Sequence, residues 1–300
     1  MKKIAVIGAG NVGSHIVSAG IAEDLPVEFL LLDQNQGFET AQVLDLKDSL
    51  LFSPDAKVKG VDFGDEDLQD ADIFVITAGT AQKPGESRCD LLGRNIEILT
   101  SIRDSLGQLK DSAIVILVSN PVDILTQVAS DIFGLAEGQV FGTGTSLDTS
   151  RLRWRLAEKL NKNITEVTGY VMGEHGDSEF VAWSTVEGSD VFSQEEKDQM
   201  QESVMKAAYE IIEGKGSTYF GIGAAAVGIL KAILEDRQEV LPVSVPLKGA
   251  YGIENIALGV PASIGENGVD YVEEVDLSEE ELQKLKACAD KLKKLLESVC

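Results

Sequence analysis

The chain has 300 residues, of which 44% are hydrophobic and 25% are charged, and its formal net charge at pH 7 is −24. This composition is typical of a globular protein and excludes a disordered chain. No apolar run approaches the roughly 20 residues needed to span a membrane. From the lack of such a run we expect no membrane partner, and because so negative a protein repels phosphate groups, we expect no nucleic acid partner.

The cysteines, histidines and N-terminal residues indicate the cellular compartment and whether a metal is bound. Cys89, Cys288 and Cys300 are widely spaced and odd in number, which predicts a reducing cytoplasm and no disulfide framework. With only 2 histidines and scattered cysteines, the sequence shows no cluster of metal ligands, so we expect no metal. The N-terminal apolar patch breaks at Asn11 and continues as polar sequence, which argues against a signal peptide.

The first half of the chain alternates short apolar runs with helix-length segments. We predict strands at residues 3–7, 27–33, 56–61, 71–79, 114–121 and 139–144, and helices that include residues 11–25 and 91–106. Continuous apolar strands are typical of a parallel sheet whose two faces are both buried. The alternation therefore predicts an α/β fold with a doubly wound parallel sheet.

A glycine pattern, GAGNVG, joins the first predicted strand to the first helix. Gly8 permits the tight turn, Gly10 lets backbone approach a pyrophosphate, and Gly13 lets helix and strand pack closely. Free N–H groups at the helix N-terminus favour phosphate. Asp33 ends the second strand 20 residues after Gly13, where a carboxylate accepts hydrogen bonds from a ribose 2′-OH and repels a 2′-phosphate. We therefore predict an NAD-binding Rossmann domain over residues 1–142, with NAD preferred to NADP.

The second half has a different rhythm. Its predicted elements are a helix at residues 147–160, a strand-like run at 164–172, the segment GEHGDSEF at 173–180, a helical region from about 194 to 236 interrupted at 214–217, and several β-like segments. Ser278 and Glu281 then form a capping box that opens a last helix. We expect an α+β substrate domain over residues 143–300, packed closely on the first half.

His175 is a candidate proton carrier, because an NAD enzyme must move a proton together with the hydride. Its pKa ordinarily lies near the working pH of an enzyme, and flanking glycines permit close substrate approach. Asp148 and Arg151, three residues apart, share one face of a predicted helix. They either form a local ion pair, or Asp148 holds the imidazole while Arg151 binds a substrate carboxylate through two parallel hydrogen bonds. A satisfied core histidine is the alternative for His175.

The polar loop of residues 78–88 follows the fourth predicted strand and contains Pro84-Gly85. Loops at the carboxyl ends of parallel strands carry ligand sites, so this one is a candidate lid. Arg88 is then either a surface arginine or a group that stabilises negative charge on a carbonyl oxygen.

GAGNVG, AGTAQKPGESR, VSNPVD, LDTSR and GEHGDSE occur in this order over essentially the whole chain and resemble the L-lactate/malate dehydrogenase family. The resemblance implies that His175 exchanges the proton with Asp148 as its partner, that Arg151 binds the substrate carboxylate, and that Arg88 polarises the carbonyl. It also implies substrate contacts by Asn120 and Thr218. The positions implied to contact NAD are Gly8, Gly10, Val12, Gly13, Asp33, Gly79, Thr80, Ser101, Val118, Asn120 and Thr143.

Gln82 occupies the loop position that distinguishes substrates within this family. Malate dehydrogenases resemble the chain but carry arginine there, to pair with a second carboxylate. A neutral glutamine suits the methyl group of pyruvate, since an unpaired carboxylate in a closed site is costly. The resemblance thus implies a cytoplasmic homodimer or homotetramer, with a place in glycolysis and fermentation, that interconverts pyruvate and L-lactate. A dehydrogenase for malate or 2-hydroxyisocaproate, and a non-catalytic NAD-binding protein, are the alternatives.

Overall fold

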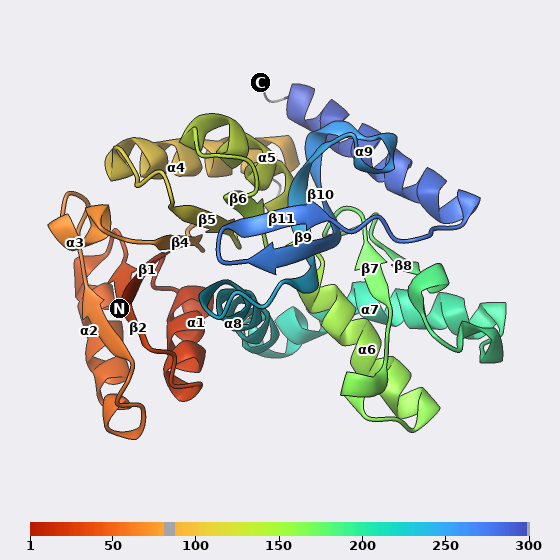
Figure 1. Cartoon of the computed structure of the whole chain (residues 1–300), viewed down its shortest axis with the longest axis horizontal. Helices are drawn as coiled ribbons and strands as arrows, with labels where there is room; N and C mark the ends of the chain where they lie inside the picture. Colours follow the sequence, from red (N-terminus) through yellow and green to blue (C-terminus); the bar gives the residue numbers. More distant parts are fainter. Residues whose placement is uncertain (81–87, 299–300) are drawn as a thin grey trace.

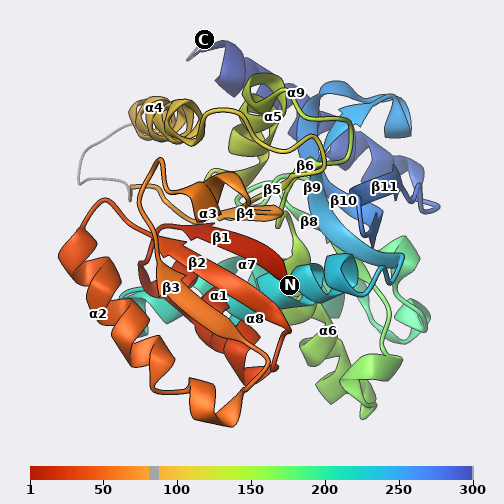
Figure 2. The ribbon, with the colours of Figure 1, turned by 60° about the vertical axis from the view of Figure 1, so that its left-hand side comes forward.

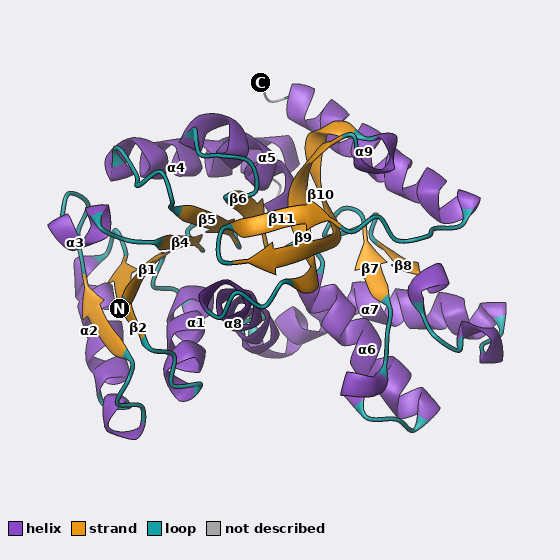
Figure 3. Cartoon of the chain, viewed as in Figure 1, coloured by secondary structure: helices purple, strands orange, loops and turns teal. Residues whose placement is uncertain are grey.

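The computed structural model describes residues 1–80 and 88–298, and of Arg88 the backbone only. Among these residues, a nine-stranded sheet in the order β11-β10-β9-β6-β5-β4-β1-β2-β3 forms the centre (Figures 1 and 3). The six strands that come first along the chain are parallel to one another: β1 (Lys2–Ile7), β2 (Val27–Leu32), β3 (Lys57–Gly60), β4 (Ile73–Ile76), β5 (Ile114–Leu117) and β6 (Val140–Gly142). Every residue of β4, β5 and β6 is buried, as their continuous apolar sequences predicted.

Helices cover both faces of this sheet. The first half contributes α1 (Asn11–Ala22), α2 (Gln36–Lys47), α3 (Glu66–Gln69), α4 (Arg88–Leu106) and α5 (Val122–Phe133). Figure 1 shows α4 and α5 on one face and α1 on the other, and Figure 2 shows α2 beside the edge strand β3. This is the predicted doubly wound arrangement.

The second half extends the same sheet and adds a smaller unit. Its elements are α6 (Ser146–Leu160), β7 (Tyr170–Met172), β8 (Phe180–Ala182), α7 (Gln194–Lys215), α8 (Phe220–Leu234), β9 (Glu239–Lys248), β10 (Glu254–Gly265), β11 (Gly268–Val272) and α9 (Glu279–Glu297). β9 joins β6 in antiparallel orientation where Gly142 faces Ser244, so the sheet continues across the predicted domain boundary. β7 and β8 form a separate antiparallel pair. The predicted fold class is confirmed.

Two local features test the sequence reading. The predicted capping box of the last helix is present, because the Ser278 side chain accepts from the Glu281 backbone N–H. The predicted strand-like run over 164–172 is a strand only at its end, as β7 (Tyr170–Met172), and its beginning is wrong, since Ile164–Glu166 is a 3₁₀ turn. The Asn163 side chain accepts from the Thr165 N–H and so caps this turn, which diverts the backbone from a strand. The remaining 3₁₀ turns are Leu50–Phe52, Trp183–Thr185, Ser189–Val191 and Ala250–Gly252.

Of the helices in the described part of the chain, none has the length and apolar character needed to cross a membrane.

Candidate active site

Most of the predicted cofactor residues lie at the ends of parallel strands. Gly8 follows β1, Asp33 follows β2, Gly79 and Thr80 follow β4 by a few residues, and Val118 and Thr143 follow β5 and β6 directly. The carboxyl ends of parallel strands meet at one edge of a sheet, where α/β proteins bind their ligands. The structure therefore brings these separate sequence motifs to one edge.

The glycine turn after β1 has the form needed to hold a pyrophosphate. A Cβ on Gly13 would lie 1.9 Å from the Gly8 oxygen, so the third glycine is required for α1 to pack against β1. A Cβ on Gly10, in contrast, would meet no atom of the described residues within 4 Å. Within residues 1–80 and 88–298, no side chain caps the N-terminus of α1, which leaves its N–H groups to a phosphate at this open surface. The residues present thus fit a dinucleotide.

Asp33 is fixed in place beside this turn. Its Oδ2 accepts from the Ala9 N–H at 2.8 Å, and its Oδ1 accepts from the Asn35 N–H at 2.9 Å. These bonds tie the end of β2 to the glycine turn after β1. The carboxylate consequently stands where the ribose of a dinucleotide bound at the turn would lie.

Asn95, which the sequence reasoning missed, joins two of the predicted ligand loops. Its buried side chain on α4 accepts from the Thr80 N–H at 2.9 Å and donates to the Asn120 oxygen at 2.8 Å. These two bonds hold the chain after β4 against the chain after β5. No signal in the sequence distinguishes Asn95 from a surface residue of the helix.

Ser101 is not brought to this site by any contact in the described part of the chain. It is exposed on α4, six residues beyond Asn95, which is roughly 9 Å along the helix axis. Its predicted contact with the cofactor stays a prediction.

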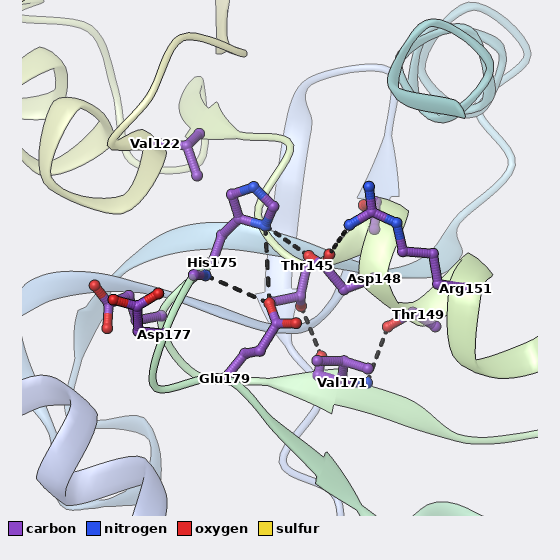
Figure 4. Close-up of polar contacts among 12 residues, drawn as sticks. Val122, Thr145, Asp148, Thr149, Arg151, Val171, His175, Asp177 and Glu179 are labelled. Atoms are coloured by element: carbon purple, nitrogen blue, oxygen red, sulfur yellow. Dashed lines mark hydrogen bonds and ion pairs between the residues drawn. The ribbon is translucent and has the colours of Figure 1, made fainter. Parts of the chain in front are cut away.

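His175 and Asp148 form the centre of the predicted catalytic group (Figure 4). Asp148 lies in the first turn of α6, and its Oδ2 is 2.6 Å from His175 Nδ1. Its Oδ1 accepts from Arg151 Nη1 at 2.8 Å. The two alternatives weighed from the sequence are therefore both partly realised: Asp148 pairs with Arg151 and also holds the imidazole. Because Nδ1 is engaged, Nε2 is the ring nitrogen left to face a substrate.

The electrostatics of the site favour a charged imidazole. Burial lowers the pKa of His175, but the charge and hydrogen bond of Asp148, together with the charges of Glu179 and Asp123, outweigh it and raise the pKa to about 9. Burial raises the pKa of Asp148 in turn, and His175 and Arg151 more than offset this, so the pKa of Asp148 is lowered. At neutral pH the imidazole is thus the protonated form, ready to donate.

Two further acids surround His175, and the sequence reasoning gave neither a role. Asp123, at the start of α5, accepts from the His175 backbone N–H at 2.7 Å and from the Ser244 hydroxyl at 2.6 Å. Burial raises its pKa to about 6. Glu179 lies 4.0 Å from His175 Nδ1, and burial and the charge of Asp148 raise its pKa to about 8. Both belong to motifs singled out in the sequence, VSNPVD and GEHGDSEF, but their burial is a tertiary property.

A cavity of about 580 Å³ opens in front of this cluster. Its lining includes His175, Asp148, Arg151 and Asn120, which are four of the predicted site residues. The rest of the lining comes from α7, from the residues around His175 (Glu174, Gly176, Asp177 and Glu179), from Pro121, from Leu91 of α4 and from Leu295 of α9. A pocket with a charged floor and a partly apolar wall is typical of a small-molecule site.

Three predicted substrate residues are not placed at this cavity by the described part of the chain. Gln82 lies outside the described residues, and of Arg88 only the backbone, at the start of α4, is described. Thr218 lies between α7 and α8 and is not among the lining residues of the cavity. Their predicted roles stay predictions.

Among the described residues, Asp148, His175 and Glu179 form a group whose geometry could hold a metal ion. Ligand atoms of Asp148, His175 and Glu179 lie within 4.8 Å of one another. Both oxygens of Asp148 are engaged by cationic side chains, His175 and Arg151, so the arrangement is that of an ion-pair network.

Comparison with protein families identifies this architecture. Residues 2–142 match the model described as lactate/malate dehydrogenase, NAD binding domain, and residues 145–300 match its alpha/beta C-terminal domain. The chain belongs to the lactate/malate dehydrogenase family. It is accordingly an NAD-dependent oxidoreductase, which agrees with the fit of the glycine turn and Asp33 to a dinucleotide.

Similar individual proteins point the same way. The chain is 41% identical over 304 residues to L-lactate dehydrogenase 1 of Listeria monocytogenes, covering 99% of this chain and 96% of that protein. It is 40% identical over 310 residues to the L-lactate dehydrogenase of Lactococcus lactis, covering 99% and 98%. Among solved structures, a lactate dehydrogenase from a Medee basin deep-sea metagenome library has a TM-score of 0.94 at 37% identity, covering 99% of this chain and 98% of that one. The minor L-lactate dehydrogenase of Enterococcus mundtii has the same TM-score and identity, covering 100% and 98%.

Proposed function

We propose that this chain reduces pyruvate to L-lactate with NADH and also catalyses the reverse reaction. The observation that carries the proposal is the arrangement of His175, Asp148 and Arg151 at the floor of one cavity. It supplies an acid and a carboxylate-binding cation, the two groups that a 2-keto acid requires. The relatives named L-lactate dehydrogenase support the choice of acid.

The proton comes from His175. In reduction the imidazolium donates from Nε2 to the carbonyl oxygen; NADH, when held by the glycine turn and Asp33, would supply the hydride that the carbonyl carbon accepts. Asp148 holds Nδ1 at 2.6 Å, which fixes the ring and stabilises its charged form. In lactate oxidation the neutral imidazole accepts the hydroxyl proton, and the same carboxylate stabilises the imidazolium that results.

The carboxylate of the substrate binds to Arg151. This side chain is buried at the floor of the cavity, and its planar guanidinium can form two parallel hydrogen bonds with a carboxylate. Two cations, His175 and Arg151, surround the single negative charge of Asp148. The guanidinium of Arg151 is therefore the group at the floor that can bind the single carboxylate of pyruvate.

Four further residues have proposed roles that rest on the sequence and its family resemblance. Arg88 polarises the carbonyl when the loop covers the substrate, and Gln82 meets the methyl group of pyruvate. Asn120 hydrogen-bonds near the carbonyl, and Thr218 contributes to the pocket wall. Oxaloacetate would bring a second carboxylate to a neutral side chain and leave it unpaired.

The substrate is tested by following NADH absorbance with pyruvate, oxaloacetate and 2-ketoisocaproate for the wild type and Gln82→Arg. We expect the wild type to give its highest kcat/KM with pyruvate. The ratio of kcat/KM for oxaloacetate to that for pyruvate should rise by more than about tenfold in Gln82→Arg, which corresponds to about 1.4 kcal/mol. A wild type that prefers oxaloacetate or 2-ketoisocaproate would replace the proposal with one of those dehydrogenases. No turnover with any of them would favour a non-catalytic NAD-binding protein.

We also propose the wider setting that these features support. Residues 1–142 form the NAD-binding domain and residues 143–300 the substrate domain, in agreement with the two matched ranges. The net charge of −24 supports the absence of a nucleic-acid partner, and the lack of a long apolar run supports the absence of a membrane partner. A cytoplasmic homodimer or homotetramer that acts in glycolysis and fermentation fits the widely spaced cysteines and the family. Light scattering of the purified protein measures the subunit number.

A further inference from the structure

Helix α9 forms hydrogen bonds with the loop that carries His175. Cys288 Sγ on α9 donates to the Ser178 oxygen at 2.9 Å. Three residues later, on the same face of the helix, Lys291 Nζ donates to Glu174 Oε2 at 2.5 Å and to Ser178 Oγ at 3.3 Å. These contacts bind the turn on both sides of His175, since Glu174 precedes it and Ser178 follows it.

The ion pair in this contact is unequal in its exposure. The Glu174 side chain is 12% exposed, whereas that of Lys291 is 41% exposed. Glu174 also accepts a hydrogen bond from the Ser178 hydroxyl, and it lines the cavity in front of His175. Lys291 is thus a partly hydrated cation that neutralises a mostly buried carboxylate at the wall of the cavity.

Removing one partner of such an ion pair destabilises the local structure more than removing both partners. An unpaired buried carboxylate is unfavourable, and it gains free energy by reaching water. Here the carboxylate can do so by turning further into the cavity, or by movement of the turn from Glu174 to Ser178 off α9, which takes His175 with it. Its negative charge would also repel an anionic substrate that enters the same cavity.

We propose that Lys291 is a positioning residue for the reaction: it holds the Glu174–Ser178 turn on α9 and cancels the charge of Glu174 beside the substrate's path. The part of this inference that concerns substrate rests on the proposed function. The part that concerns the turn stands on the contacts of Lys291 alone.

The test is a double-mutant cycle of Lys291→Met, Glu174→Gln and the combined variant, with Lys291→Arg as the conservative change. Lys284→Met is the matched control. Lys284 lies on the same helix and pairs with Glu280 at 2.7 Å, with both side chains well exposed. For each protein we would measure KM and kcat with pyruvate at low ionic strength, the NADH dissociation constant, and hydrogen exchange of the amides of residues 174–178 without ligand.

Lys291→Met should raise the KM for pyruvate by about tenfold or more and leave NADH affinity within about twofold, because the glycine turn and Asp33, which hold the dinucleotide, lie outside the cavity that Glu174 lines. Exchange in the turn should become faster. In the combined variant the Glu174→Gln change removes the unpaired charge that causes both effects, so KM and exchange should return most of the way to wild type. Lys291→Arg and Lys284→Met should resemble the wild type.

A Lys291→Met protein that matches Lys284→Met in KM and in exchange would overturn the proposal. So would a combined variant that is no better than Lys291→Met. The exchange measurement needs no turnover, so it decides the role of Lys291 in the turn even if the wild type fails to reduce pyruvate, a result that would instead remove the proposed function.

Discussion

Replacing Asp148 with asparagine keeps the shape of the side chain but removes the charge that faces the His175 imidazolium. The carboxylate oxygen and Nδ1 are 2.6 Å apart, and the Asp148 side chain is only 1% exposed, so water screens the pair weakly. Of the groups that raise the pKa of His175, Asp148 contributes most. Without the Asp148 charge, burial, which lowers the pKa of His175, is the main remaining influence on that pKa.

The magnitude follows from the two pKa values. The difference between the ordinary value of 6.5 and about 9 corresponds to roughly 3 kcal/mol in favour of the charged ring. In Asp148→Asn we expect the pKa of His175 to fall to 6.5 or below. Pyruvate reduction needs the imidazolium, so activity is present below this pKa and is lost as pH rises through it. At about pH 8 the charged fraction should therefore drop roughly thirtyfold relative to wild type.

The assay is kcat/KM for pyruvate at saturating NADH across pH, for wild type, Asp148→Asn and the exposed control Asp290→Asn on α9. The wild type and the control should lose reduction activity near pH 9, and Asp148→Asn should lose it near pH 6.5 or below. Since the chain has 2 histidines, the imidazole resonances measure the pKa of His175 directly. If Asp148→Asn loses activity at the same pH as the wild type, Asp148 does not set the charge of His175 and the reasoning is refuted.

The other predictions concern the support of the site and the cofactor turn. Asp123→Ala removes the acceptor of two buried hydrogen bonds, one of them from the His175 backbone, and should lower the free energy of unfolding by about 1–3 kcal/mol while reducing kcat/KM. Denaturant unfolding beside Asp131→Ala, an exposed change on the same helix, checks this, and equal stability of the two variants would contradict it. Gly10→Ala should fold normally but bind NADH weakly, because its new methyl group occupies open surface at the turn, whereas Gly13→Ala should also lose stability, since its Cβ would lie 1.9 Å from a backbone oxygen. Fluorescence titration with NADH and thermal unfolding separate the two, and unchanged NADH affinity in Gly10→Ala would place the pyrophosphate elsewhere.

The sheet was predictable because its determinants are local. Each buried parallel strand is a short apolar run, and the glycine turn is required by contacts within a few residues of the first strand, such as that between Gly13 and Gly8. The same holds for the capping box at Ser278. Where a side chain competes locally with the backbone, as Asn163 does, the apolar pattern predicted a strand that is not there.

The site was predictable only in part. The spacing of Asp148 and Arg151 indicated a shared helix face, and the family resemblance joined them to His175 across the chain. Asp123, Glu179 and Asn95 were missed, because an acid or amide in a polar motif reads as exposed until tertiary packing is known. Their roles depend on burial against elements distant in sequence, as the bond from Ser244 to Asp123 illustrates.

The central claim, that His175 is the acid of an NADH-dependent pyruvate reductase, is tested most directly by His175→Asn. The measurement is the single-turnover rate of NADH oxidation by pyruvate, together with the NADH dissociation constant, for this variant and the wild type. We predict rapid oxidation by the wild type, loss of turnover in His175→Asn by at least about a hundredfold, and nearly equal NADH affinity, because the glycine turn and Asp33 hold the cofactor. Turnover of pyruvate by His175→Asn at the wild-type rate, or loss of NADH binding in parallel with turnover, would contradict the account.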